Sequence, residues 1–83
     1  MRLTVKYFAS IREALGRGSE ALDTSAANLA QLRDELVARG GAYAQSLARG
    51  KSVRVALNQV MSEESAPLRE GCEVAFFPPV TGG

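Results

Sequence analysis

The sequence predicts a small α+β domain in which one main helix covers one face of a mixed β-sheet. Three observations support this fold class. Residues 2–7 alternate between polar and apolar side chains, as a strand with one buried face does. Residues 72–77, at the opposite end of the chain, are mostly apolar and are predicted to form the last strand. Residues 28–39 carry an apolar stripe with helical spacing. The first and last strands cannot form a hairpin and are among the most apolar segments, so we place both at the centre of the sheet.

The first strand, residues 2–7, has Leu3, Val5 and Tyr7 on one face and polar residues on the other. Phe8 does not fit this scheme, because its parity places it among the polar side chains.

A short helix and a second strand follow. The residues from Ser10 to Glu13 have the spacing of a capping box, which predicts the start of the helix there, and Gly16 lies where it would end. Residues 20–24 are weakly strand-like. A tight connection through residues 17–19 lets them pair with the first strand as a hairpin.

The main helix begins after Asn28, a favourable N-cap with Gln31 at the capping-box position. Gly40 and Gly41 are expected to end it. A further short helical turn is expected around residues 43–47. The apolar stripe that faces the sheet consists of Leu29, Leu32, Leu36 and Val37.

The remaining residues are predicted to form strands and the turns between them. Residues 52–57 alternate again, Asn58-Gln59 bends the chain, and Val60-Met61 form a brief further strand. Residues 67–71 form a turn before the last strand. One helix on one face of such a sheet is the β-grasp arrangement. We expect residues 1–77 to form this domain and residues 78–83 to form an extended tail.

Composition excludes several classes of function. The chain has 83 residues, 46% of them hydrophobic, and a net charge of +1, which predicts one globular domain with no affinity for nucleic acid or anionic membranes. We expect no signal peptide and no membrane span, and therefore a cytoplasmic protein. With no His and a single Cys, the chain has no base for a Ser or Cys nucleophile and no Cys/His metal site. Any catalysis would need a partner.

The carboxyl terminus carries the most specific functional signal. Pro78-Pro79 ends the last strand and favours an extended exit, and the chain then ends in Gly82-Gly83. Six residues after Phe77 can reach about 20 Å. Because glycine has no side chain, this tip can enter a channel that is too narrow for other residues.

An aromatic patch is predicted from strand parity. Phe77 has the parity of Glu73 and Ala75 rather than that of Val74 and Phe76, so it points away from the helix, as Phe8 does. If their strands are neighbours, the two rings form an exposed patch that Met61 extends. A contiguous exposed apolar patch indicates a docking surface. The alternative is that residues 17–24 or the tail cover it.

Three segments resemble one known family. Residues 5–13 (VKYFASIRE), 57–59 (LNQ) and 73–83 (EVAFFPPVTGG) are similar to the small subunit of molybdopterin synthase, and the resemblance covers nearly the whole chain. Members of that family are ubiquitin-like sulfur carriers. The resemblance also places Arg12 in a matching segment, where it would meet an acidic partner surface.

The resemblance implies a cycle at Gly83. An ATP-dependent activating enzyme adenylates the terminal carboxylate, and a sulfur donor protein supplies the sulfur that converts it into a thiocarboxylate. The tail, from Pro79 through Val80, Thr81 and Gly82, then enters the active site of the large synthase subunit. There the sulfur builds the dithiolene of molybdopterin from cyclic pyranopterin monophosphate. The implied assembly is a heterotetramer, and the chain itself binds no cofactor or metal and is not a catalyst.

Three alternatives remain open. A carrier for thiazole synthesis or tRNA thiolation shares the terminal Gly-Gly, although the residues from Phe76 to Thr81 favour molybdopterin. A covalent protein modifier would join Gly83 to a lysine. A plain interaction domain would make no use of the tail.

Several other residues are interpreted as structural. Cys72 stands where the family commonly has Asp, and we favour a small, half-buried residue at a strand start over a sulfur relay. The adjacent Glu63 and Glu64 are interpreted as solvent-exposed acids. Arg49 and Lys51 read as solubilising loop charges rather than as ligands of a phosphate.

Overall fold

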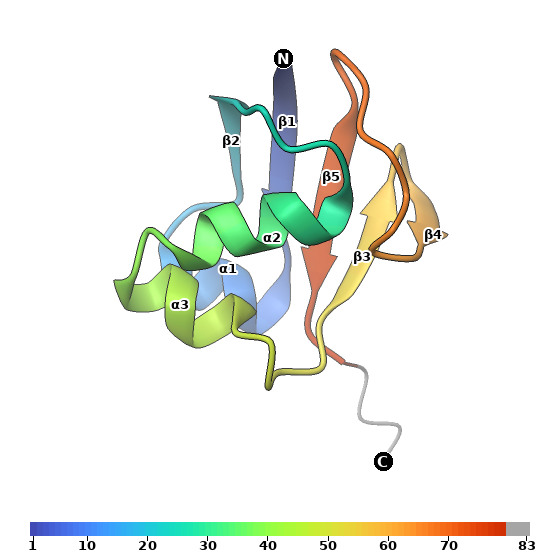
Figure 1. Cartoon of the computed structure of the whole chain (residues 1–83). Helices are drawn as coiled ribbons and strands as arrows, with labels where there is room; N and C mark the ends of the chain where they lie inside the picture. Colours follow the sequence, from blue (N-terminus) through green and yellow to red (C-terminus); the bar gives the residue numbers. More distant parts are fainter. Residues whose placement is uncertain (80–83) are drawn as a thin grey trace.

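The computed structural model describes residues 1–79. Within this range a five-stranded sheet has the order β2-β1-β5-β3-β4, and α1, α2 and α3 lie on one side of it (Figure 1). None of the helices in the described residues is long and apolar enough to cross a membrane. In chain order the elements are β1 (Arg2–Tyr7), α1 (Ala9–Leu15), β2 (Ser19–Asp23), α2 (Leu29–Val37), α3 (Gly41–Leu47), β3 (Arg54–Leu57), β4 (Val60–Ser62) and β5 (Glu73–Phe77).

The centre of the sheet confirms the predicted topology. β1 and β5 pair in parallel, and the other pairs, β1–β2, β3–β5 and β3–β4, are antiparallel. The predicted alternation of β1 also holds, because its three apolar side chains are buried against the helices. The fully buried side chains of the core include Leu3, Val5 and Tyr7 of β1, Val74 and Phe76 of β5, and Leu29, Leu32 and Leu36 of α2.

Two helix boundaries differ from the sequence prediction. α1 begins at Ala9, one residue before the predicted Ser10 cap, and its N-cap, Phe8, makes no side-chain capping bond. The reason is tertiary: the Phe8 amide still donates to Phe76 O on β5 (3.2 Å), and the Phe8 carbonyl accepts the first helical bond, from Ile11 N (3.2 Å). α2 ends at Val37 rather than near Gly40, which instead precedes α3 with φ 77°.

Other local predictions are confirmed. The Asn28 side chain accepts a hydrogen bond from Gln31 N (2.9 Å), and Gly16 ends α1 with φ 73°. Asn58 and Gln59 both have positive φ, 49° and 69°, as the two central residues of a type I′ hairpin turn require. This turn joins β3 to β4.

Arg33 is a buried charge that the sequence pattern did not reveal. Its side chain is almost fully enclosed and hydrogen-bonds through its three nitrogens. Nε donates to Leu47 O (2.7 Å), Nη2 to Ala48 O (2.7 Å) and Lys51 O (2.9 Å), and Nη1 to Glu64 Oε2 (2.6 Å). A buried guanidinium is tolerated only when it is paired and bonded in this way. Arg33 therefore fixes the segment after α3 to α2.

Arg49 completes this cluster. It pairs with both Glu64 and Asp34 and donates to Ala30 O (2.9 Å). The interpretation of Glu64 and Arg49 as merely solvated charges was therefore wrong. They stand far apart in sequence, and only the packing of the 64–68 loop against the start of α2 brings them together; there the Ala30 amide donates to Glu64 O (2.8 Å).

A second polar cluster lies at the other end of the core. Glu20 on β2 accepts hydrogen bonds from the hydroxyls of Tyr7 and Tyr43, each 2.7 Å to Oε2, and pairs with Arg39 (2.9 Å) and Arg17 (3.4 Å). Burial alone would raise the pKa of Glu20, but the hydrogen bonds from Tyr43, Arg39 and Tyr7 together hold it below the usual 4.5. Burial, reinforced by the bond to Glu20, raises the pKa of Tyr7.

We predict that Glu20→Gln destabilises the fold by about 1–2 kcal/mol at neutral pH, because charged hydrogen bonds are replaced by neutral ones. The folded-state pKa of Glu20 lies below its unfolded value, so the contribution of this carboxylate is present above about pH 4.5 and is lost as the pH falls through the folded pKa. Denaturant unfolding between pH 7 and pH 3 should therefore show a shallower loss of stability for the variant.

Glu13→Gln is the matched control. Glu13 is exposed on α1, and its carboxylate forms no hydrogen bond or ion pair within residues 1–79. The Glu13→Gln variant should show the same dependence of stability on pH as the wild-type protein. A Glu20→Gln variant with an unchanged pH dependence would show that Glu20 does not couple folding to protonation.

Candidate docking site at the carboxyl end of the sheet

The candidate site lies where β5 ends. Phe77 is the last residue of β5, and Pro78 and Pro79 follow at the surface. The predicted tail residues Val80, Thr81, Gly82 and Gly83 lie outside the described residues. Their roles, and the division into a domain of residues 1–77 and a tail of residues 78–83, stay predictions.

Phe8 and Phe77 lie together on the face of the sheet opposite the helices. In the parallel pairing of β1 with β5, Tyr7 is the partner of Phe76, so the next residue of each strand falls on the outer face beside the other. The two rings stack with their centroids 4.7 Å apart and their planes 9° from parallel. Phe8 is 39% exposed and Phe77 is half-buried. The predicted juxtaposition is confirmed.

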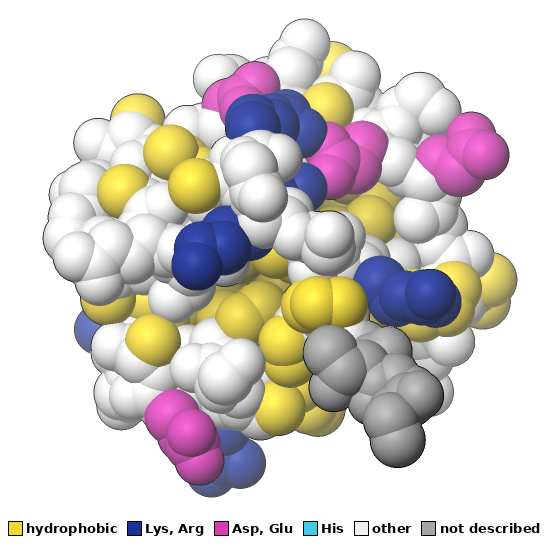
Figure 2. Space-filling model, turned by 90° about the horizontal axis from the view of Figure 1, so that it is seen from below, with side chains coloured by type: hydrophobic (Ala, Val, Ile, Leu, Met, Phe, Trp, Pro, Cys, Tyr) yellow, Lys and Arg dark blue, Asp and Glu magenta, His cyan; other side chains and the backbone are white. Residues whose placement is uncertain are grey.

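Met61 extends this surface from β4. It is the register partner of Ala56 on β3 and is 53% exposed. Together these side chains border an open hollow of about 500 Å³, which we call the aromatic hollow. Its lining consists of Phe8, Ala9, Arg54, Met61, Phe77, Pro78 and Pro79. Figure 2, which views the end of the molecule where β5 finishes, shows hydrophobic side chains gathered there.

Ala9 explains how Phe8 reaches this face. Phe8 has extended angles (φ −127°, ψ 154°), and Ala9 then takes a positive φ of 51° before α1 proceeds. A left-handed conformation costs a residue with a Cβ roughly 1–2 kcal/mol. Strain of this kind gathers at functional sites. Here it turns the chain into α1 while Phe8 stays in the plane of the sheet.

Arg12 does not line the aromatic hollow. It is exposed on α1 and borders a neighbouring depression with Arg17 and Gly18, and only Ala9 is shared with the hollow. Gly18 lies close to it: a Cβ there would come within 3.2 Å of Arg12 Nε. The positive charge therefore sits beside the apolar surface rather than within it.

Arg54 is a site residue that the sequence analysis did not select. It is the register partner of Phe77 on β3 and gives the aromatic hollow a cation. The signal was available, because residues 52–57 alternate and Arg54 has the parity opposite to that of Val53 and Val55.

A second hollow lies on the other side of Pro78-Pro79, the residues at which the predicted tail begins. The sequence did not predict this hollow. It has a volume of about 420 Å³ and opens between α1 and α3, and we call it the α1–α3 hollow. Pro78 and Pro79 line both hollows. The root of the tail is thus a wall with a depression on each side.

Cys72 is more deeply placed than predicted. It is buried rather than half-buried, directly before β5, and its carbonyl accepts a hydrogen bond from Thr4 N (3.1 Å). A sulfur relay needs an accessible thiol. Burial therefore supports the structural interpretation of Cys72.

The geometry suits docking rather than chemistry. Stacked aromatic rings, a methionine and two prolines form an apolar surface with Arg54 at its border, and such surfaces mark protein–protein contacts. The chain has no His to serve as a base. This end of the molecule is therefore suited to binding a partner protein.

Comparison with known proteins identifies relatives over almost the whole chain. The sequence profile of the ThiS family matches residues 5–83. A protein of Haemophilus influenzae named molybdopterin synthase sulfur carrier subunit is 38% identical over 81 residues, which are 98% of this chain and 99% of that protein. A protein of the same name from Escherichia coli is 37% identical with the same coverage.

Solved structures agree with the fold. SAMP1 of Haloferax volcanii, a small archaeal modifier protein, superposes with a TM-score of 0.79 at 25% identity, and each chain is covered completely. A chain from the complex of subunits 1 and 2 of the molybdopterin-converting factor of Helicobacter pylori gives a TM-score of 0.68 at 26% identity, also with complete coverage of both. The predicted ubiquitin-like β-grasp fold is confirmed.

We predict opposite stability effects for two adjacent phenylalanines. Phe76→Ala should destabilise the domain by about 3–5 kcal/mol, because Phe76 is fully buried and its loss leaves a cavity. Phe77→Ala should cost less, about 1–2 kcal/mol, because it removes a half-buried ring and its stack with Phe8 but leaves no cavity in the core. Thermal and denaturant unfolding of both variants checks this.

Phe8→Ala is the companion variant, since it removes the other ring of the same stack and should match Phe77→Ala. A Phe77→Ala protein that unfolds as readily as Phe76→Ala would place Phe77 in the core and contradict a docking role.

Proposed function

The chain belongs to the ThiS family and, within it, to the molybdopterin synthase sulfur carrier subunits, and from this membership we propose the chemistry of its terminus. Gly83 carries sulfur as a thiocarboxylate and delivers it for the dithiolene of molybdopterin. The observation that carries the proposal is the exposed Phe8–Phe77 stack, which lies at the root of a tail that ends in Gly-Gly.

Loading proceeds in three steps. A carboxylate oxygen of Gly83 attacks the α-phosphorus of ATP, pyrophosphate leaves, and an acyl adenylate forms. The outer sulfur of a persulfide on a donor protein then attacks the acyl carbon and AMP leaves, taking the C–O bonding pair. A thiol of a partner protein attacks the donor's sulfur in the resulting acyl disulfide, forms a disulfide with it, and releases the thiocarboxylate with the S–S bonding pair. Adenylation is needed because a carboxylate oxygen is a poor leaving group. Once the bond to the donor is cleaved, the thiocarboxylate is a sulfur nucleophile that requires no Cys or His from this chain.

The aromatic hollow docks the partners. Its apolar lining, with Arg54 at the border and Arg12 on the adjacent surface, fits a partner that combines apolar side chains with acidic ones. The large subunit of molybdopterin synthase is the partner for transfer, and the solved two-subunit complex from Helicobacter pylori supports this. The ATP-dependent activating enzyme docks on the same surface, because both partners must receive the same tail.

The carrier is a co-substrate rather than a catalyst. The activating enzyme binds the ATP, the large subunit supplies the catalytic groups, and this chain binds no cofactor of its own. We expect a cytoplasmic complex with two copies of each subunit.

The likeness to SAMP1 favours a second candidate function. A modifier begins with the same adenylation, but the acyl group of Gly83 then passes to a lysine amine and forms an isopeptide bond. Carriers for thiazole synthesis or tRNA thiolation also begin in this way. The product at Gly83 separates modifiers from carriers, and the partner separates the carriers from one another.

We predict that deleting Gly83 abolishes sulfur transfer and leaves the fold intact, because the fully buried core side chains of residues 1–79 lie between Leu3 and Phe76. The measurements are molybdopterin formation in a reconstituted assay and the melting temperature. The intact mass of the wild-type protein from cells should show one oxygen replaced by sulfur.

Adding one Ala after Gly83 is the matched variant, since it keeps every native residue and removes only the reacting carboxylate from its place. Undiminished molybdopterin formation by either variant would overturn the carrier mechanism. Adducts of this chain on lysines of other proteins, without a thiocarboxylate, would favour the modifier.

We further predict that Phe77→Ala weakens binding to the large subunit about thirtyfold, since a docked aromatic anchor contributes ~2 kcal/mol or more. Titration calorimetry with the purified large subunit measures this. Val60→Ala is the control: Val60 is an exposed apolar residue of β4, 66% accessible, that does not line the aromatic hollow. Equal losses for the two variants would show that the aromatic hollow is not the docking surface.

A further inference from the structure

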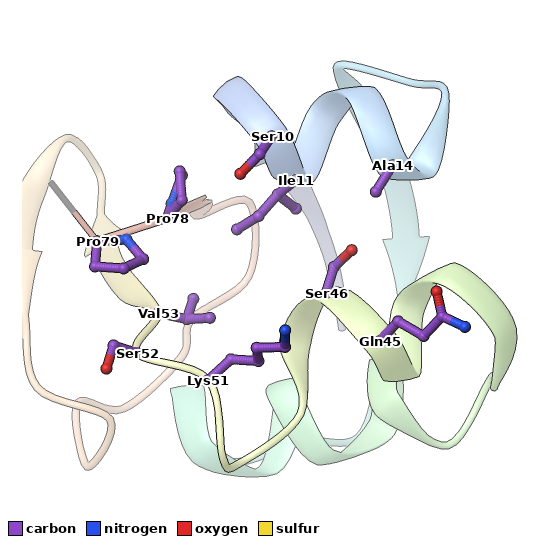
Figure 3. Close-up of a pocket in the computed structure, with 10 residues that line it drawn as sticks. All are labelled: Ser10, Ile11, Ala14, Gln45, Ser46, Lys51, Ser52, Val53, Pro78 and Pro79. Carbon is purple, nitrogen blue, oxygen red and sulfur yellow. The ribbon is translucent and has the colours of Figure 1, made fainter. Parts of the chain in front are cut away.

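The α1–α3 hollow combines an apolar floor with hydrogen-bond donors. Ile11 and Ala14 of α1 and Val53, just before β3, supply the apolar side, and Figure 3 shows them arranged around the cavity. The tail root, Pro78-Pro79, closes one side. At about 420 Å³ the hollow falls in the range of small-ligand sites, which is enough for a short stretch of peptide.

The polar lining of this hollow suits an anion. Hydroxyls of Ser10, Ser46 and Ser52 come from separate elements, and the side chain of Lys51 extends toward α3 (Figure 3). No Asp or Glu is among the described residues that line it. Among residues 1–79, no carboxylate lies within ion-pair distance of the Lys51 ammonium. The ammonium group is thus available as a counter-ion.

The backbone that carries Lys51 is held in place. The buried Arg33 guanidinium donates to Lys51 O (2.9 Å), and Lys51 N donates to Ala48 O (2.8 Å). The cation therefore projects from a fixed segment, so a ligand that meets it need not order the loop first.

We propose that the α1–α3 hollow binds the chain's own carboxyl-terminal residues, 80–83, in the free carrier, with Lys51 as the counter-ion of the Gly83 carboxylate. Four residues beyond Pro79 can reach about 13–14 Å, and they start at the wall of the hollow. The segment has one apolar side chain, Val80, for the apolar floor, and it ends in the negative charge that the lining lacks.

The aromatic hollow is a poorer receptor for the same segment. Among residues 1–79, those that line it include no hydroxyl side chain and one polar side chain, Arg54, whereas a peptide end with a carboxylate and several amides needs several donors and acceptors. Docking on the α1–α3 side also leaves the Phe8–Phe77 stack open, so a partner can bind before the tail is released.

The tail needs only a weak intrinsic affinity for the α1–α3 hollow, because it is tethered to the domain. A short tether gives an effective concentration in the millimolar range, so an intrinsic Kd of about 1 mM leaves the tail docked roughly half of the time. A partner that captures the released tail then loses only about twofold in apparent affinity. Weak docking of this kind shields the terminus without blocking its use.

The test is NMR on the full-length free carrier, which needs neither a partner nor sulfur and so fails or succeeds independently of the proposed function. We expect contacts between the Val80 methyls and those of Ile11 and Val53, and slower tumbling of the Thr81, Gly82 and Gly83 amides than in a random coil. Lys51→Gln should reduce the docked-to-free ratio about two- to fivefold, as an exposed ion pair contributes. Raising the salt concentration should act in the same direction.

Arg69→Gln is the matched control, because it removes an exposed cation in the turn before β5, away from the lining of the α1–α3 hollow, and should leave these signals unchanged. Val80 contacts with Phe8 or Met61 instead of Ile11 and Val53 would overturn the proposal. The proposal would also be overturned if the Thr81, Gly82 and Gly83 amides of the wild-type protein tumbled as fast as in a random coil. An unchanged docked-to-free ratio in Lys51→Gln would overturn it as well.

Discussion

The parallel pairing of β1 with β5 is the constraint on which the rest of the molecule depends. It joins the two ends of the chain at the centre of the sheet, with Tyr7 opposite Phe76 in the core. One residue further along both strands, the same register places Phe8 against Phe77 on the opposite face. The core and the docking surface are thus set by one ladder. A slip of one residue would exchange them.

This arrangement explains how a chain without a catalytic base can serve in a chemical reaction. The domain supplies an apolar surface where β5 ends, and in the proposed mechanism the reactive group is the terminal carboxylate of Gly83. Since Pro78 and Pro79 line both hollows, the surface proposed to recognise a partner and the hollow proposed to receive the tail adjoin each other.

The ionic clusters hold the elements that surround this site. Arg33 links α2 to the segment after α3 and to Glu64, and Glu20 links β2 to Tyr7, Tyr43 and Arg39. A buried pair of this kind contributes more to the choice of one arrangement than to net stability, since its desolvation offsets much of the attraction. Arg33 is therefore best understood as the residue that fixes where Lys51 and the wall of the α1–α3 hollow lie.

By itself the sequence determined the period of each strand, the stripe of α2, the hairpin turn at Asn58-Gln59 and the outward parity of Phe8 and Phe77, because these follow from local geometry. The family also followed from sequence, through the residues that end in Gly82-Gly83. Tertiary structure alone decided the start of α1 at Ala9, because the Phe8 amide donates to Phe76 O on β5 and Phe8 is thereby held in an extended conformation up to the helix. It also decided the burial of Arg33 and Cys72, the pairing of Arg49 with Glu64, and the α1–α3 hollow. Each of these joins residues distant in sequence, and no local pattern records which distant groups will meet once the core has packed.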